Sequence, residues 1–147
     1  MNKIDLYNKA YNLAKQYHAG QTDKSGKDYF LNHIKVVSDM VLENENNLDA
    51  AIVALLHDIL EDTSISEDHL RQIFPKYIVD AVCVLTKQKH EPYWIYIEKV
   101  KKNKLARIVK KYDLANNMDM SRLDIISDKD LEREIKYAKA YAQLMKL

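Results

Sequence analysis

The sequence predicts an all-α fold, arranged as one helical bundle. Hydrophobic residues make up 47% of the chain and charged residues 31%, with only two Gly and two Pro. This composition supplies a core but few turn formers, which is typical of helices and not of sandwiches or barrels. Apolar residues recur at three- and four-residue spacing, and no alternating strand pattern is convincing. A length of 147 residues fits a single domain over 1–147.

The first half of the chain reads as helices separated by one long polar loop. Apolar spacing predicts an amphipathic helix over residues 3–18. Residues 19–30 are polar and contain both glycines, which indicates a loop with special backbone requirements or ligand contacts. A second helix is expected over residues 31–43. Its inward-facing residues are expected to be Leu31, Ile34, Val37, Met40 and Val41.

The third predicted helix starts near Asp49 and is apolar on nearly all sides over residues 50–56. A helix without a polar face is normally buried at the centre of a domain. It runs directly into His57 and Asp58, so polar side chains emerge from the core at that point. Further helices are expected over residues 66–74, 76–87, 92–102, 104–120 and 128–146.

Charge and hydropathy exclude several classes of function. Lys plus Arg number 23 and Asp plus Glu number 22, so no global positive field favours nucleic acid. We expect no membrane association and a cytoplasmic location, because the N-terminus lacks an apolar signal core and no run of eighteen apolar residues exists. The single Cys83 lies in an apolar stretch and is expected to be a small buried hydrophobe. The oligomeric state stays open.

Three groups of polar residues stand beside apolar helices and are candidates for chemistry. They are His33; His57 and Asp58 with Glu61 and Asp62; and Asp113 with Asn117. Residues four apart share a helix face, so these groups form columns of potential ligands and proton carriers. Two imidazoles and two carboxylates make a nitrogen and oxygen shell that suits Mn²⁺, Fe²⁺ or Zn²⁺ better than Ca²⁺.

Structural explanations compete with each functional one. A lone histidine such as His33 is more often a satisfied core or surface residue than a ligand. Glu61 and Asp62 end a helix, where the dipole disfavours negative charge, and this hints at a compensating cation. We expect surface positions for His18, His69 and His90, core positions for Tyr93, Trp94, Tyr96 and Ile97, and a solvated face for Lys99, Lys101, Lys102 and Lys104.

The order and spacing of these residues resembles the hydrolase domain of the RelA/SpoT enzymes, within the HD superfamily, over nearly the whole chain. The first matching block comprises residues 18–21 and 24–26 with Tyr29 and His33. The second is residues 54–63, which are close to the signature HD-x-x-E-D-T segment. The third is residues 106–110 leading to 113–118, which resembles the final D-x-x-x-N block.

The resemblance implies a metal-dependent phosphohydrolase. It implies that one metal ion, Mn²⁺, is held by His33, His57, Asp58 and Asp113. Glu61 and Asp62 would activate and orient the attacking water. The substrate would be a small-molecule nucleotide, guanosine 3′,5′-bis(diphosphate), cut at its 3′ ester to release pyrophosphate.

The resemblance also implies a set of substrate contacts. They are Lys24, Ser25, Asn117, Arg133 and Tyr137, with Lys87 as a weaker candidate. The chain departs from the pattern at Asp23, which stands where many members have an Arg that packs on guanine, and at Asp119, which replaces a frequent Arg. An acid cannot stack as a guanidinium does. Another nucleotide substrate, or a non-catalytic module that senses a nucleotide, therefore remains an alternative.

Overall fold

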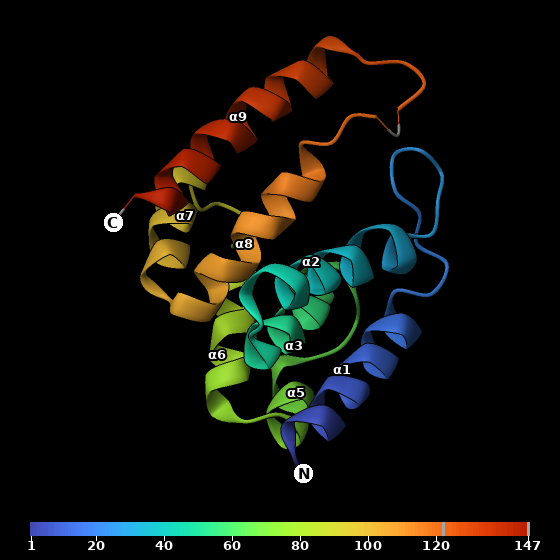
Figure 1. Cartoon of the computed structure of the whole chain (residues 1–147), viewed down its shortest axis with the longest axis vertical. Helices are drawn as coiled ribbons and strands as arrows, with labels where there is room; N and C mark the ends of the chain where they lie inside the picture. The colour runs from blue at the N-terminus through green and yellow to red at the C-terminus, as the bar shows by residue number, and fades with distance from the viewer. Residues whose placement is uncertain (122, 147) are drawn as a thin grey trace.

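The computed structural model describes residues 1–121 and 123–146, and these residues form helices joined by loops (Figure 1). Apart from one isolated bridge between Thr22 and Asp28, the described residues contain no β-structure, so the all-α prediction is confirmed. In chain order the helices are α1 Lys3–Tyr17, the π-helix η1 Phe30–Ile34, α2 Lys35–Glu45, α3 Leu48–Leu56, α4 Ile59–Asp62, α5 Glu67–Ile73, α6 Lys76–Leu85, α7 Tyr93–Lys102, α8 Lys104–Asn117 and α9 Asp128–Met145.

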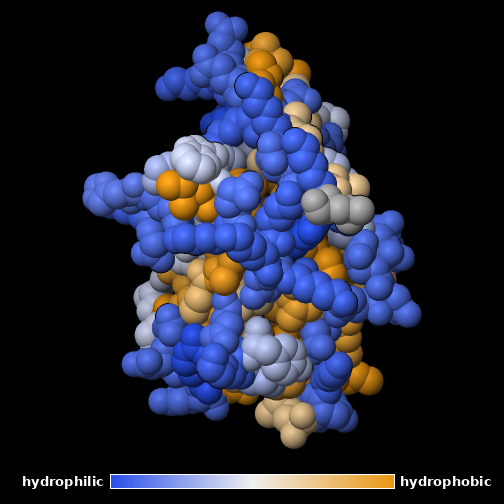
Figure 2. Space-filling view, turned by 90° about the vertical axis from the view of Figure 1, so that its left-hand side faces the viewer, coloured by the Kyte–Doolittle hydropathy of each residue, from blue (hydrophilic) through white to orange (hydrophobic). Residues whose placement is uncertain are grey.

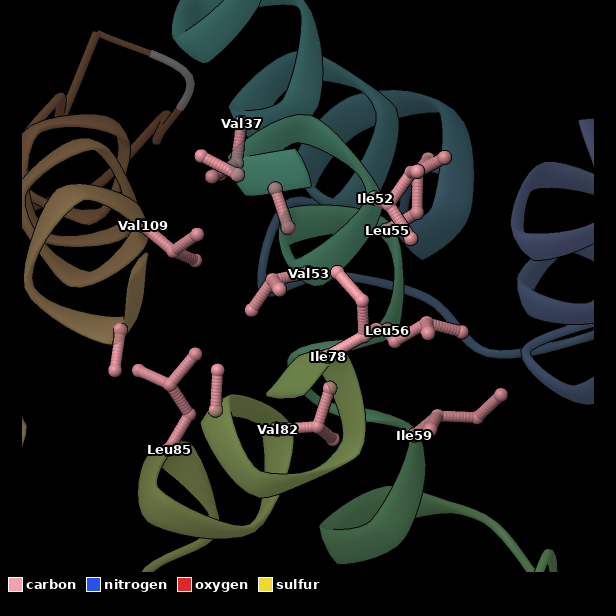
Figure 3. Packing of buried hydrophobic residues seen from close by; sticks show 14 of the residues in the cluster. Val37, Ile52, Val53, Leu55, Leu56, Ile59, Ile78, Val82, Leu85 and Val109 are labelled. Atoms are coloured by element: carbon pink, nitrogen blue, oxygen red, sulfur yellow. The ribbon is translucent and has the colours of Figure 1, made fainter. Parts of the chain in front are cut away.

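Helix α3 lies at the centre of the bundle, as its sequence predicts. Asn47 caps its start by accepting a hydrogen bond from the Ala50 amide at 3.0 Å. Every residue from 50 to 56 is fully buried, and α1, α2, α6 and α8 all pack against this helix. Figure 3 shows Leu56 of α3 close to Ile78 of α6 in this cluster. The apolar run of α3 therefore ends at the buried His57.

The second predicted helix is present but begins with a π turn, and this corrects its inward face. In η1 the backbone N–H of Lys35 bonds to the carbonyl of Phe30, so one extra residue fits into the turn. Phe30 and His33 consequently face the core, whereas Leu31 is 52% exposed and not buried as predicted. Helix α2 ends at Glu45, and its C-cap Asn46 adopts a left-handed conformation with φ of 48°.

The C-terminal helices form a second layer over α8. Helix α9 starts with a capping box between Ser127 and Asp130 and packs on α7 and α8. Arg107 of α8 donates to the carbonyls of Leu144 and Lys146, each at 2.6 Å, and so fixes the end of α9. The prediction for Trp94 was wrong, because it is 69% exposed beside the groove between α7 and α9, while Tyr96 and Ile97 are buried.

Most of the remaining surface predictions are confirmed. His69 and His90 are exposed, and of the lysine run only Lys101 is half-buried. Cys83 is half-buried and not fully buried as expected, and burial together with Glu67 raises the pKa of its thiol to about 11. Hydrophilic residues cover most of the face in Figure 2, with apolar residues in patches between them. No helix in the described part of the chain is long and apolar enough to cross a membrane.

Shortening one buried side chain of the central helix α3 should test this arrangement. We expect Leu55→Ala to lower the free energy of unfolding by about 2–5 kcal/mol, because it leaves a cavity in a fully buried layer. The half-exposed Leu31 is the matched control, and Leu31→Ala should change the free energy by no more than about 0.5 kcal/mol. Urea unfolding followed by circular dichroism measures both; equal losses would contradict the outward position of Leu31.

Candidate metal centre

Four side chains from separate parts of the chain converge beside the C-terminal end of α3. His33 comes from η1, His57 and Asp58 from the junction of α3 and α4, and Asp113 from α8. Oδ1 of Asp113 lies 2.8 Å from Nε2 of His33 and 3.4 Å from Nε2 of His57. Oδ2 of Asp58 lies 3.2 Å from Nε2 of His57 and 3.8 Å from Nε2 of His33. The structure thus brings together all four residues expected to bind metal.

The outer nitrogen of each imidazole faces an acceptor, so a ring that donates through Nδ1 turns Nε2 toward the carboxylates. Nδ1 of His57 is 2.5 Å from the carbonyl oxygen of Ala54, and Nδ1 of His33 is 2.7 Å from Oδ1 of Asn116. A neutral imidazole donating through Nδ1 presents a lone pair at Nε2. The buried Nε2 of His57 makes no hydrogen bond. Two nitrogen lone pairs facing carboxylate oxygens fit a divalent cation.

The electrostatics of the cluster favour ionised ligands. Burial opposes the charged form of the Asp113 carboxyl, but Lys110 together with a protonated His57 outweighs burial and holds the pKa of Asp113 well below the usual range. Nζ of Lys110 lies 2.8 Å from Oδ2 of Asp113, which leaves Oδ1 for the histidines. For Asp58, likewise, a protonated His57 outweighs burial and lowers the pKa, and a bound divalent ion would take the place of the His57 proton. Both carboxylates are therefore ready ligands.

Further polar side chains hold the ligands in place. The hydroxyl of Tyr29 donates to Oδ2 of Asp58 at 2.5 Å, and burial together with Asp58 raises the pKa of Tyr29, which keeps it a donor. The side-chain amide of Asn117 donates to Oδ1 of Asp113 at 3.2 Å. Asn117 thus contacts a candidate ligand as well as lining the adjacent cavity.

Glu61 and Asp62 lie on α4 at the exposed side of the cluster. One carboxylate oxygen from each of Asp58, Glu61 and Asp62 lies within 4.8 Å of the others. Burial, with Asp58 close by, raises the pKa of both Glu61 and Asp62. The backbone N–H of Lys87 donates to Oε1 of Glu61 at 3.1 Å. A raised pKa makes a carboxylate a stronger proton acceptor.

The prediction for His18 was wrong, because this residue is fully buried. As the C-cap of α1 it packs its ring 5.7 Å from the ring of Tyr29, measured between centroids. Its Nδ1 lies 2.7 Å from Oε1 of Gln21, whose amide donates to the carbonyl of Asp62 at 2.9 Å. Gln21 therefore connects the loop over residues 19–30 with α4, and His18 holds the Gln21 side chain.

A cavity of about 280 Å³ opens beside His33, between the loop over residues 19–30 and α9. Five residues that the resemblance implies as substrate contacts line this cavity: Lys24, Ser25, Asn117, Arg133 and Tyr137. The weaker candidate, Lys87, does not line it. Tyr29 lines it too, so the cavity adjoins the ligand cluster. Glu61 and Asp62 are not among its lining residues.

Asp23, the main departure from the family pattern, builds the loop. Its Oδ1 accepts hydrogen bonds from the amide of Ser25 at 2.9 Å, the hydroxyl of Ser25 at 2.7 Å and the amide of Lys27 at 3.0 Å. Gly26 follows with φ of 83°, a left-handed value that favours glycine. An acid at position 23 thus closes a tight turn that presents Ser25 to the cavity.

Sequence reasoning missed three residues that orient the candidate ligands. Tyr29 appeared only as part of a matching block, and Lys110 and Asn116 carried no predicted role. The three-residue spacing of Lys110 and Asp113 on one helix is a signal that could have identified the ion pair. Nothing local relates Asn116 to His33, because the two residues are 83 positions apart.

Comparison with known proteins identifies the family. The profile described as the HD domain matches residues 10–125, which include every candidate metal ligand. The helical bundle carries a cluster of histidine and aspartate side chains that could hold a metal ion, and the chain belongs to the HD domain family.

Two curated relatives match between half and two thirds of the chain. A Mycoplasma genitalium protein named "Probable guanosine-3′,5′-bis(diphosphate) 3′-pyrophosphohydrolase" is 36% identical over 91 residues, covering 60% of this chain and 12% of that protein. The Escherichia coli K12 protein named "Bifunctional (p)ppGpp synthase/hydrolase SpoT" is 32% identical over 81 residues, covering 55% of this chain and 11% of that protein. The matches thus span about an eighth of each relative's length.

One solved structure supports the fold over nearly the whole chain. It is described as a metazoan ortholog of SpoT that hydrolyses ppGpp and plays a role in starvation responses. It aligns with a TM-score of 0.78 and 22% identity, covering 96% of this chain and 85% of the other. This similarity extends beyond the sequence matches and includes the C-terminal helices.

The contact between Asn116 and His33 predicts that metal affinity depends on Asn116, although Asn116 is not itself a candidate ligand. Asn116→Ala should weaken Mn²⁺ binding about 10–100-fold, because the His33 ring loses the acceptor that orients it. Asn116→Asp keeps an acceptor oxygen and should retain most of the affinity. Titration with Mn²⁺ by electron paramagnetic resonance measures both; equal affinities in the Ala variant and the parent would refute the orienting role.

Proposed function

We propose that this chain is a metal-dependent phosphohydrolase that cleaves the 3′ ester of guanosine 3′,5′-bis(diphosphate) and releases pyrophosphate. The observation that carries this proposal is the convergence of two imidazole nitrogens and two carboxylates beside a cavity bordered by Lys24 and Arg133. Family membership and the names of two relatives support the same reaction.

The proposed metal ligands are His33, His57, Asp58 and Asp113. A shell of two nitrogens and two oxygens suits a moderately hard divalent ion, and we assign Mn²⁺ as the metal. When bound, such an ion lowers the pKa of a coordinated water and offsets charge that builds on phosphoryl oxygens. Lys110 already neutralises part of the negative charge of this ligand set through Asp113.

Glu61 and Asp62 are the proposed catalytic carboxylates. Glu61 lies close to Asp58 and accepts the proton of the attacking water, a role that its raised pKa favours. Asp62 orients the same water from the neighbouring position on α4. Asn117 holds Asp113 and turns its remaining polar atoms toward the phosphate in the cavity.

The proposed contacts with the nucleotide lie around the cavity. Lys24 and Arg133 bind phosphate oxygens, while Ser25 and Tyr137 add hydroxyl donors. Asp23 is bound within its own loop and supplies no guanidinium for stacking on a base. This feature favours, as a second candidate, a phosphohydrolase of the same chemistry acting on another nucleotide; a non-catalytic sensing module is the third.

The proposal also covers the extent of the domain, the partner and the location of the protein. We propose one domain over residues 1–147, of which 122 and 147 lie outside the described residues. The chain takes a small-molecule nucleotide as its partner, in the cytoplasm, with no nucleic acid or membrane required. The balanced charge of +1 agrees with this assignment.

The activity test is release of pyrophosphate from guanosine 3′,5′-bis(diphosphate) with and without Mn²⁺. We expect metal-dependent release, and we expect His57→Ala to abolish both release and bound metal because it removes a central ligand. If the protein binds metal but releases no pyrophosphate, its substrate is another nucleotide. If the His57→Ala variant still releases pyrophosphate, the proposed metal site is rejected.

Glu61→Gln separates catalysis from metal binding. The variant should retain Mn²⁺ affinity, since Glu61 is not a proposed ligand, and should lose turnover by about 100-fold or more. Single-turnover rates and metal content, measured on the same preparation, separate the loss of catalysis from the loss of metal. Gln88, exposed in the loop after α6, provides the control through Gln88→Ala, which should leave both quantities unchanged. Unaltered hydrolysis in the Glu61 variant would remove it from the mechanism.

A further inference from the structure

The carboxylate of Asp130 pairs with the two cations that border the cavity. Nζ of Lys24, from the loop over residues 19–30, lies 3.1 Å from Oδ1 of Asp130. The guanidinium of Arg133, one turn along α9, pairs with the same oxygen. The Asp130 side chain is only 12% exposed, so this ion-pair group is partly shielded from solvent. In Figure 1 the loop lies near the segment that leads into α9.

The second oxygen of the same carboxylate has a different task. Oδ2 of Asp130 accepts hydrogen bonds from the amide of Ser127 at 2.9 Å and from its hydroxyl at 2.8 Å. The bond from the Ser127 amide, together with the Asp130 amide donating to Oγ of Ser127 at 3.2 Å, forms the capping box of α9. Because the cap uses Oδ2 and the cations use Oδ1, the two tasks are separable by substitution.

A carboxylate and a phosphate compete for the same donors, since both are oxyanions that lysine and arginine bind through charge-assisted hydrogen bonds. We propose that Asp130 is a specificity-determining residue, an internal anion that occupies Lys24 and Arg133 until the phosphate groups of a ligand displace it. The inference rests on the proposed function, which makes these two cations the phosphate contacts.

The negative charge of the cavity wall makes the competition between Asp130 and a ligand depend on the charge of the ligand. Asp23, Asp119 and Glu134 also line the cavity, so carboxylates outnumber cations among its described lining residues. A ligand with little negative charge gains nothing by breaking the pairs with Asp130. A diphosphate brings enough charge and enough acceptor oxygens to engage Lys24 and Arg133 together. Asp130 therefore sets the minimum charge that a ligand needs to bind.

The test uses inorganic pyrophosphate as the ligand and the full chain, loaded with Mn²⁺ and freed of excess metal. Asp130→Asn removes the charge while leaving an oxygen that can cap α9. We expect it to bind pyrophosphate about five- to tenfold more tightly in calorimetric titration, the size expected when two partly exposed ion pairs cease to compete. Ser127→Ala, the matched control, breaks the capping box but leaves the ion pairs, and its affinity should equal that of the parent.

An unchanged or weaker affinity in Asp130→Asn would overturn the proposal, and so would an equal gain in Ser127→Ala. If Asp130→Asn fails to fold by circular dichroism, Asp130→Ser, which also removes the charge, replaces it with the same expected gain. Pyrophosphate serves here only as a binding ligand. The result is therefore independent of whether the chain hydrolyses guanosine 3′,5′-bis(diphosphate), and failure of one proposal is distinguishable from failure of the other.

Discussion

Burial of α3 on every side is the constraint on which the rest of the structure depends. This helix has no polar face, so α1, α2, α6 and α8 must each cover part of it. Its last turn then delivers His57 to the inside of the bundle, and α8, one of the covering helices, delivers Asp113. The packing that stabilises the fold is thus the same packing that sets the distances between the candidate ligands.

The ligand cluster concentrates negative charge and nitrogen lone pairs where water is largely excluded. Such a group is costly to bury unless positive charge accompanies it. Lys110 supplies one positive charge through Asp113, and a divalent ion would supply the rest. Tyr29 and Asn116 contribute differently, because each holds one ligand in a single orientation before any ion arrives. Stability and function are therefore linked at this point of the bundle.

The sequence predicts those features that depend on local pattern and misses those that depend on distant contacts. Helical periodicity is enough to predict α3 as a buried helix, and the spacing of residues 57–62 is enough to select the candidate ligands and acids. Nothing in the sequence signals a π turn, so Leu31 was assigned to the wrong face. His18 was misjudged because its burial depends on Tyr29 and Gln21, and Trp94 because α9 leaves it uncovered. The contact of Asn116 with His33 requires the fold itself.

The π turn at Phe30–Ile34 also bears on how this part of the chain tolerates insertions and deletions. An ordinary helix advances by about 100° for each residue, so losing one residue rotates everything before it by that angle. In η1 the wide turn takes up one residue more than an α-helical turn holds, so the extra residue is absorbed locally. Tyr29 on one side of the turn contacts Asp58, while His33 and α2 on the other side stay in the core. The π turn thus sets the angular phase between the loop over residues 19–30 and the helix that carries His33.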